Sequence, residues 1–526
     1  MPAHRLTVAI TCVCLGLLLA LGLARRWTNP TRAADLHPRP DAFEYEEAAR
    51  NLIEGNGYSL IFDEQKFPPR YPVGFSLILV PALWFDGATG GGVRVALAAA
   101  AVAIILTWRL GALTGGMLSA AAAALFLAVS PLHVSLSQVV MSDVPSSALV
   151  LLLALWTMAL ERRDRGPGGW FALGAAIGLA ASVRFTNAFL VPPIALTVAL
   201  RSETLRPRVL RLASLTAGVC VGLAPVLWHH AAVFGSPWKT GYDFWVGARY
   251  LEWRFAAGPA PVVWTEVNPL AYARVLAGDG RLYTWPIAVL MVIGCFVGLR
   301  RRGPARTLVT LALGFTGALF AFHSFFFWQA DRFFIPALPL LAVLAALPLG
   351  HGAPRLVRGA AVALALLGVV GTPRSAQRMD RGFREVAALR DIGQRIEPNA
   401  VLMVRTNPAF FERILRAPGV DRLWIPLGLC EWRRAIRQAG LRGYAPASPT
   451  PWILDAIEGP GDVARIGERL APLMADGRPV YLAAVRGFDI EFLGALRNTL
   501  GATLGTETLP PAQQWGLIRV GRTPEP

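Results

Sequence analysis

Residues 41–72, which read DAFEYEEAARNLIEGNGYSLIFDEQKFPPRYP, form a polar and aromatic stretch between two strongly apolar segments. A protein that crosses a bilayer many times and performs chemistry at one membrane surface needs such a stretch near that surface. Its first part, residues 42–54, has a helix-like pattern, and Pro68 and Pro69 restrict the backbone near its end. We therefore interpret residues 41–72 as an active-site loop and extend the analysis outward from it.

The composition places the chain among integral membrane proteins. Hydrophobic residues make up 54% of the 526 residues and charged residues only 16%. Apolar runs of spanning length recur as far as residue 372 and predict a polytopic, mainly α-helical bundle of about eleven spans. The first run could be a cleavable signal peptide, but the many later runs favour a retained helix. The expected spans are residues 6–24, 92–110, 116–134, 144–160, 170–183, 185–200, 212–234, 282–299, 307–323, 333–350 and 359–372.

The net charge of +17 does not indicate nucleic acid binding, because the basic residues gather in short loops between apolar runs. By the positive-inside rule these loops should be cytoplasmic. Counting spans from a cytoplasmic N-terminus then puts residues 41–72, the junction at Asp143, the loop 235–281 and the C-terminal part on the opposite, extracytoplasmic side of the plasma (inner) membrane. The Arg-rich loops are residues 161–169, 201–211, 300–306 and 351–358.

The chain divides into a membrane part, residues 1–372 with an outer catalytic loop at 25–72, and a soluble part, residues 373–526. Short β-rich runs near 401, 423, 480 and 516 alternate with helical patterns at residues 383–395, 431–440, 462–475 and 490–500. This alternation predicts a small extracytoplasmic α/β domain. It carries no dinucleotide fingerprint, phosphate loop or nucleophile elbow, so we expect no catalytic site of its own.

Two acids stand at the ends of spans in a region that is otherwise poor in acids. Asp41 opens the loop, where Tyr45 and Tyr71 accompany it, and Asp143 opens the span that begins at residue 144. Either carboxylate could simply cap a helix, and Asp41 could also be a solvated loop acid. In the functional interpretation, a carboxylate at the membrane surface accepts a proton from an acceptor hydroxyl.

Two arginines interrupt or border apolar sequence at Arg184 and Arg332. Each could reach the interface by extending its long side chain. Each could equally bind the phosphate of a lipid substrate, because a guanidinium matches phosphate geometry in a bidentate way. The aromatic residues of the loop 235–281 could likewise anchor it among headgroups or stack on a sugar.

The order of these motifs resembles the GT-C superfamily of membrane glycosyltransferases. The motifs are D-x-x-x-Y at 41, G-x-G-Y at 55, PP-x-YP-x-G at 68, MSD-x-P at 141, VR-x-T at 183 and DRF-x-x-P-x-x-P at 331. They look most like glycosyltransferase family 39, the dolichyl-phosphate-mannose protein mannosyltransferase-like group, which includes aminoarabinose transferases and Rgt-type core sugar transferases. The resemblance covers residues 5–372.

The resemblance implies roles for individual residues. Asp41 matches the catalytic base and Asp143 the second acid, while Arg332 matches the late basic position linked with the lipid phosphate. Lys66 and Arg70 flank the turn where relatives contact the donor. Two departures leave the sugar and acceptor open: Ala42 replaces the acid that follows the base in protein mannosyltransferases, and the lysine-proline-proline run of aminoarabinose transferases is spread out as KFPPR.

The hypothesis from the sequence is transfer of a sugar, with inversion, from a polyprenyl-phosphate donor to a hydroxyl of an envelope glycan, lipid or protein. Arg332, with Arg184 or Arg70, would stabilise the leaving phosphate. The two acids leave a divalent metal open, although no pattern requires one, and we expect no other cofactor. The alternatives are a transporter or lipid flippase, which would concentrate charge at mid-membrane, and a noncatalytic assembly factor, in which the loop acids need not converge.

Overall fold

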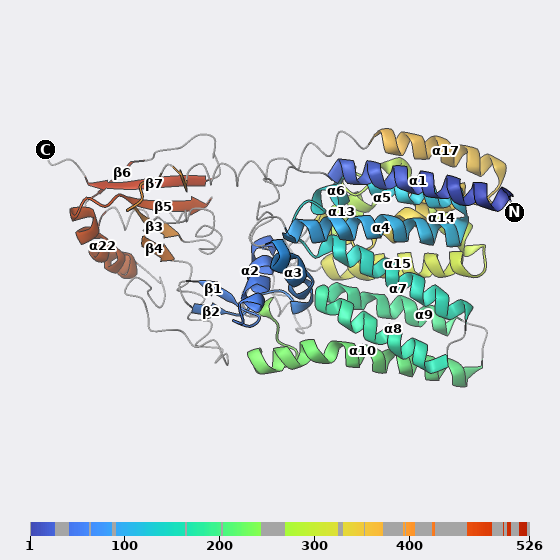
Figure 1. Ribbon diagram of the computed structural model, residues 1–526, viewed down its shortest axis with the longest axis horizontal. Helices are drawn as coiled ribbons and strands as arrows, with labels where there is room; N and C mark the ends of the chain where they lie inside the picture. Colours follow the sequence, from blue (N-terminus) through green and yellow to red (C-terminus); the bar gives the residue numbers. More distant parts are fainter. Residues whose placement is uncertain are drawn as a thin grey trace.

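The structure is a computed structural model, and it shows a long bundle of helices with a small sheet beyond one end (Figure 1). In the membrane part it describes residues 2–26, 41–62, 65–86, 91–163, 166–200, 204–242, 269–324, 330–351 and 353–371. In the C-terminal part it describes residues 393–394, 396–404, 423–426, 460–485, 498, 502–505 and 515–522.

The bundle follows the apolar runs of the sequence, since each predicted span coincides with helical structure. Within the described residues, five helices are long and apolar enough to cross a membrane, and five shorter apolar stretches accompany them. The bundle consists of α1 (Pro2–Arg26), α4 (Gly91–Gly115), α5 (Met117–Val129), α6 (Pro131–Leu136), α7 (Asp143–Arg162), α8 (Gly166–Val183), α9 (Val191–Ala199), α10 (Leu205–Phe234), α13 (Pro269–Leu276), α14 (Trp285–Leu299), α15 (Pro304–Ser324), α16 (Leu338–Ala346) and α17 (Arg355–Val370).

Short 3-10 segments lie between some of the helices of the bundle. The segment η1 (Phe185–Leu190) separates α8 from α9, and Arg184 between them has an extended backbone. The expected spans 170–183 and 185–200 are therefore a full helix, a break at Arg184 and a 3-10 segment followed by a short second helix. A second segment, η4 (Asp331–Phe334), leads into α16, and η5 (Leu347–Leu349) follows it.

The outer surface of the bundle is apolar, as a lipid-facing surface must be. Large side chains such as Leu152, Val221 and Leu366 are exposed, while the interior holds one continuous apolar cluster that includes Ile104 and Leu341. Exposed apolar area on this scale is incompatible with a water-soluble bundle. The chain is an integral membrane protein.

Helices α8 and α10 pack backbone to backbone through four glycines. A Cβ on Gly218 would lie 2.0 Å from the carbonyl oxygen of Phe171, and one on Gly222 would lie 2.1 Å from that of Ala175. Gly174 on α8 approaches the Leu215 carbonyl in the same way. Small residues at such spacing let membrane helices approach closely and gain dispersion contacts along their length. We call these glycines, together with Gly178, the glycine seam.

The Arg-rich loops gather at the end of the bundle where α1 begins. The Arg301 guanidinium donates to the carbonyl oxygens of Thr114 and His351. On the same side of the bundle, the Thr307 hydroxyl donates to Glu161. The loops 161–169, 300–306 and 351–358, which the positive-inside rule assigns to one side, thus contact one another or neighbouring helices.

The opposite end of the bundle carries the loop 41–72. Here α2 (Asp41–Ile53), the antiparallel pair β1 (Leu60–Phe62) and β2 (Gln65–Phe67), and α3 (Val73–Asp86) pack across the helix ends (Figure 1). The helical pattern predicted for residues 42–54 is therefore confirmed as α2. At the far end of α3, Trp84 and Phe85 are exposed, as expected of residues at a membrane interface.

The C-terminal part contains a five-stranded sheet in the order β4-β3-β5-β7-β6. Strands β3 (Val401–Val404), β4 (Leu423–Pro426) and β5 (Val480–Val485) are parallel, whereas β7 (Trp515–Arg522) is antiparallel to both of its neighbours, β5 and β6 (Ala502–Gly505). The four predicted strands occur, β6 adds a fifth, and α22 (Pro460–Ala475) matches the helical pattern at 462–475. The other three predicted helices lie wholly or almost wholly outside the described residues, and the division into two domains at residue 372 stays a prediction.

Candidate active site

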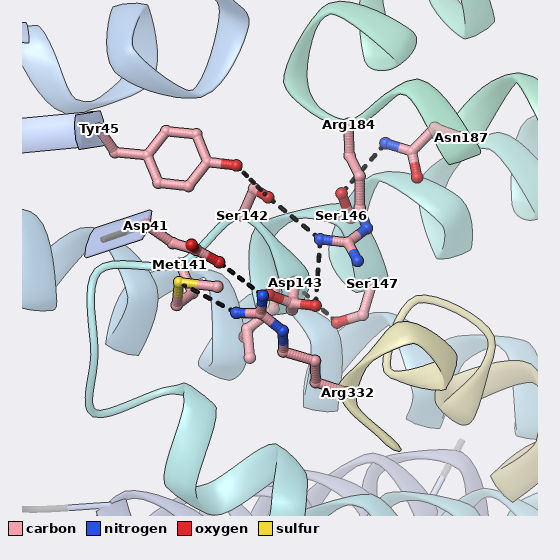
Figure 2. A network of polar contacts seen from close by, with 11 residues as sticks. Asp41, Tyr45, Met141, Ser142, Asp143, Ser146, Ser147, Arg184, Asn187 and Arg332 are labelled. Atoms are coloured by element: carbon pink, nitrogen blue, oxygen red, sulfur yellow. Dashed lines mark hydrogen bonds and ion pairs between the residues drawn. The ribbon is translucent and has the colours of Figure 1, made fainter. Parts of the chain in front are cut away.

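Four segments far apart in the chain meet at the end of the bundle beneath α2. They are the first turn of α2, the first turn of α7, the break before η1, and η4, and together they bring both predicted acids and both membrane arginines into one cluster (Figure 2). The local sequence explains why each side chain is available there. Each segment is the start of a helix or an interruption between helices, so its side chains project from the end of the bundle and not into lipid.

Asp41 and Arg332 form the central ion pair. The Nη2 atom of Arg332 donates to Oδ2 of Asp41 at 2.5 Å, which joins residues 291 positions apart. The Asp41 side chain is 7% exposed and that of Arg332 21%. The other terminal nitrogen of Arg332, Nη1, faces the sulfur of Met141 at 3.8 Å, a weak acceptor. This guanidinium therefore has one strongly bound edge and one weakly bound edge.

The charge environment keeps Asp41 ionised. Burial alone would raise its pKa, but the Arg332 guanidinium, a hydrogen bond from Tyr71 and the charge of Arg70 outweigh burial and hold the pKa of Asp41 below its usual range. Asp41 is thus neither a solvated loop acid nor an isolated cap. It is a buried carboxylate held by a cation.

Asp143 and Arg184 form a second pair beside the first. The distance from Arg184 Nη1 to Asp143 Oδ1 is 3.1 Å, and the Asp143 side chain is fully buried. Neither oxygen of Asp143 accepts a well-aligned hydrogen bond from another described residue. The N-cap position of α7 belongs to Ser142, whose side chain makes no capping bond. Asp143 is therefore held by charge, and the capping interpretation of this acid does not apply.

A third pair links α2 to the proline turn. The Arg70 guanidinium lies 3.1 Å from Glu44 Oε1, and the backbone amide of Arg70 lies 3.3 Å from Oε2 of the same carboxylate. Burial raises the pKa of Glu44 to about 7, with the charge of Arg70 opposing the rise. Three acids and three arginines thus meet in matched pairs, and the cluster has no net charge when all are ionised.

Tyrosines form one wall of this cluster. The rings of Tyr45 and Tyr71 stack with centroids 4.6 Å apart, and Tyr242 meets Tyr71 edge-on at 5.6 Å. The Tyr45 hydroxyl also bonds to the Ser142 hydroxyl at 3.0 Å, and that hydroxyl in turn accepts from Arg184 at 3.4 Å. The wall therefore connects α2 to the second ion pair.

Tyr242 reaches the wall because the residue before it is glycine. A Cβ at Gly241 would lie 2.2 Å from the carbonyl oxygen of Pro69 and 2.6 Å from the Cα of Arg70. The beginning of the loop 235–281 thus rests directly on the proline turn of the first loop. Trp238 is exposed, in keeping with an interfacial anchor. Trp245, Tyr250, Trp253 and Trp264 lie outside the described residues.

The cluster contains seven of the eight residues predicted from the sequence. The exception is Lys66, whose ammonium is exposed and donates to the carbonyl oxygen of Asn56 at 3.1 Å. Conversely, Glu44, Ser142 and Tyr242 belong to the cluster but were not among the predicted site residues. Glu44 lies one helical turn after Asp41 and Ser142 directly precedes Asp143, so both carried a positional signal, whereas Tyr242 was one aromatic among many. The residues present in the cluster are Asp41, Asp143, Arg332, Arg184, Arg70, Tyr45 and Tyr71.

The donor set does not favour a bound metal ion. Among the described residues no three His, Cys, Asp or Glu side chains gather closely enough to hold one. Asp41 and Asp143, which the sequence left open as shared ligands, each face an arginine instead. The chemistry of the cluster is that of fixed cations and carboxylates.

Comparison with known proteins bears on the fold that carries this cluster. Residues 72–229 match the family model described as dolichyl-phosphate-mannose-protein mannosyltransferase. The whole chain superposes on ArnT from Cupriavidus metallidurans bound to undecaprenyl phosphate, with a TM-score of 0.63 and 16% identity, over 98% of this chain and 99% of that one. The chain has the GT-C glycosyltransferase fold.

Further matches agree with this assignment. The apo form of the same ArnT gives a TM-score of 0.60 with 15% identity over 100% of both chains. An apo oligosaccharyltransferase from Archaeoglobus fulgidus gives 0.51 with 12% identity, over 90% of this chain and 69% of that one. No curated protein sequence matched. The predicted resemblance to GT-C enzymes and the predicted class, a membrane glycosyltransferase, are confirmed by the family match together with the fold.

Proposed function

We propose that this GT-C protein transfers a sugar from a polyprenyl-phosphate donor to a hydroxyl group of an envelope glycan, lipid or protein. The observation that carries the proposal is the contact of Asp41 with Arg332, which puts a carboxylate base and a phosphate-binding cation at one point. A relative of the same fold is bound to undecaprenyl phosphate, which supports a lipid-phosphate donor here.

In the proposed reaction the acceptor oxygen attacks the anomeric carbon of the sugar from the face opposite the phosphate. Asp41 takes the hydroxyl proton as the new carbon–oxygen bond forms. The bond from the anomeric carbon to the phosphate oxygen breaks with its electron pair, so the lipid phosphate leaves and the configuration inverts. Arg332, assisted by Arg184 or Arg70, stabilises the charge on the departing phosphate. Asp143 keeps Arg184 in place at the edge of the site.

The orientation belongs to the same proposal. The Arg-rich loops lie at the end of the bundle opposite the cluster, so the positive-inside rule assigns the cluster to the extracytoplasmic face of the plasma membrane. The two alternatives fit the geometry less well. A transporter would concentrate its charges at mid-membrane, and a noncatalytic assembly factor would not need Asp41, Asp143 and Arg332 in one cluster.

The test is Asp41→Asn, assayed in membranes with labelled polyprenyl-phosphate sugars. Loss of the base should lower the transfer rate by about a hundredfold or more, while the near-identical shape preserves the fold. Glu54→Gln, at an exposed acid just after α2, is the matched control and should leave the rate unchanged. Transfer at the normal rate by Asp41→Asn would remove the base from this mechanism, and absence of any labelled product from wild-type membranes would remove the donor class.

A further inference from the structure

The cation best placed for the donor phosphate is already occupied in this structure. The Nη2 edge of Arg332 binds the carboxylate of Asp41 at 2.5 Å, and the other two arginines are held by Asp143 and Glu44. No guanidinium of the three pairs is therefore without an acid. Whatever phosphate enters must compete with a carboxylate for its cation.

The base is occupied by the same contact. A carboxylate hydrogen-bonded to a guanidinium has a lone pair committed to that bond and a reduced tendency to accept a proton. An acceptor hydroxyl that approached Asp41 in this state would meet a weak base. Asp41 and Arg332 thus neutralise each other. Asp41 becomes an effective base, and Arg332 an effective phosphate ligand, only when the contact between them is broken.

The geometry offers a route for this release. The Nη1 edge of Arg332 faces the Met141 sulfur at 3.8 Å, so a phosphate oxygen can take that position at little cost. A phosphate prefers to bind both terminal nitrogens of a guanidinium side by side. Its second oxygen would then replace Asp41 at Nη2. Arg332 remains partly exposed and lies in η4, a four-residue 3-10 segment between longer elements.

We propose that the donor phosphate displaces Asp41 from Arg332, so that the catalytic base is released only when the donor is bound. The inference rests on the proposed function and adds an order of events to it: donor first, then activation of the base, then proton transfer from the acceptor. In the absence of donor, the contact with Arg332 would keep Asp41 a weak base that does not deprotonate the acceptor.

Binding of undecaprenyl phosphate to purified protein in nanodiscs provides the test. If Asp41 competes for Arg332, Asp41→Asn should bind this lipid more tightly than wild type, by at least about tenfold given the usual strength of close interfacial charge pairs. Arg332→Ala should bind it more weakly. The effect is diagnostic because removing a residue that only helped to bind the donor would weaken binding.

The double variant separates competition from simple repulsion. Removing the charge of Asp41 lessens repulsion of any nearby anion, even without Arg332. In an Arg332→Ala background, Asp41→Asn should therefore retain only a small part of its tightening effect. Glu54→Gln, which removes a charge from the same loop away from Arg332, should bind like wild type.

Three results would overturn the exchange. Affinity that is unchanged or weaker in Asp41→Asn would show that the two groups do not compete, and equal tightening with and without Arg332 would reduce the effect to general repulsion. In both cases, with wild-type binding intact, the proposed function survives. A wild-type protein that binds no undecaprenyl phosphate would overturn both proposals together.

Discussion

The glycine seam and the ion-pair cluster hold the same bundle together by opposite means. In the seam, Gly218 and Gly222 let two backbones touch, with no charge and no polar side chain involved. In the cluster, arginines and acids from five segments balance one another around the proposed substrate position. The seam should be sensitive to volume and indifferent to pH, whereas the cluster should be sensitive to charge and more tolerant of volume.

Gly218→Leu is expected to have the largest effect. The new side chain would begin 2.0 Å from the Phe171 carbonyl and must force α8 and α10 apart, at a cost on the order of 3 kcal/mol or more. We expect little folded protein by size-exclusion chromatography in detergent. Gly168→Leu on α8, where a Cβ would meet nothing within 4 Å, is the control and should fold normally. Equal yields for the two variants would contradict a packing role for the seam.

Asp143→Asn should have the next largest effect on stability. Loss of the fully buried carboxylate leaves Arg184 without its acid, which costs about 3 kcal/mol for a buried pair. Asp279→Asn removes an acid from the exposed pair with Arg281 and should cost no more than about 0.5 kcal/mol. Thermal unfolding in detergent compares the two. Similar shifts for both variants would show that burial does not distinguish the cluster from surface pairs.

The smallest effect is a pH dependence that resides in the cluster and not in the seam. Glu44 has a pKa raised from its ordinary value of 4.5 to about 7. Between these values the folded protein binds more protons than the unfolded chain, so its stability should fall as pH rises. Glu44→Gln should flatten the melting temperature between pH 5 and about 7. A wild-type curve that rises across this window, or an unchanged slope in the variant, would contradict the assignment.

The helices could be predicted because each one is marked by the hydropathy of its own residues. That the key residues share one end of the bundle could be predicted because the number of spans between two residues decides whether they lie on the same side of the membrane. The sequence could not predict which acid meets which arginine. Asp41 pairs with Arg332 and not with Arg70, which is much nearer in the sequence. This choice depends on the path of η4 across the helix ends, which is set by the packing of the whole bundle. Lys66 was likewise expected to contact the donor because of its place beside the prolines, but its ammonium is exposed on β2 and donates to the Asn56 carbonyl, outside the cluster.

The equal number of acids and arginines in the cluster also bears on selectivity among lipids. Membranes contain many phospholipids with anionic headgroups that would bind to three uncompensated guanidinium groups. With Asp41, Asp143 and Glu44 in place, a headgroup gains from Arg332 only what exceeds the carboxylate contact it displaces. An ordinary phospholipid offers a phosphate alone, whereas a glycosylated lipid can add contacts of its sugar with the tyrosine wall. Under the proposed function, the acids would thereby keep abundant bilayer lipids from blocking the site of a scarcer glycosylated donor.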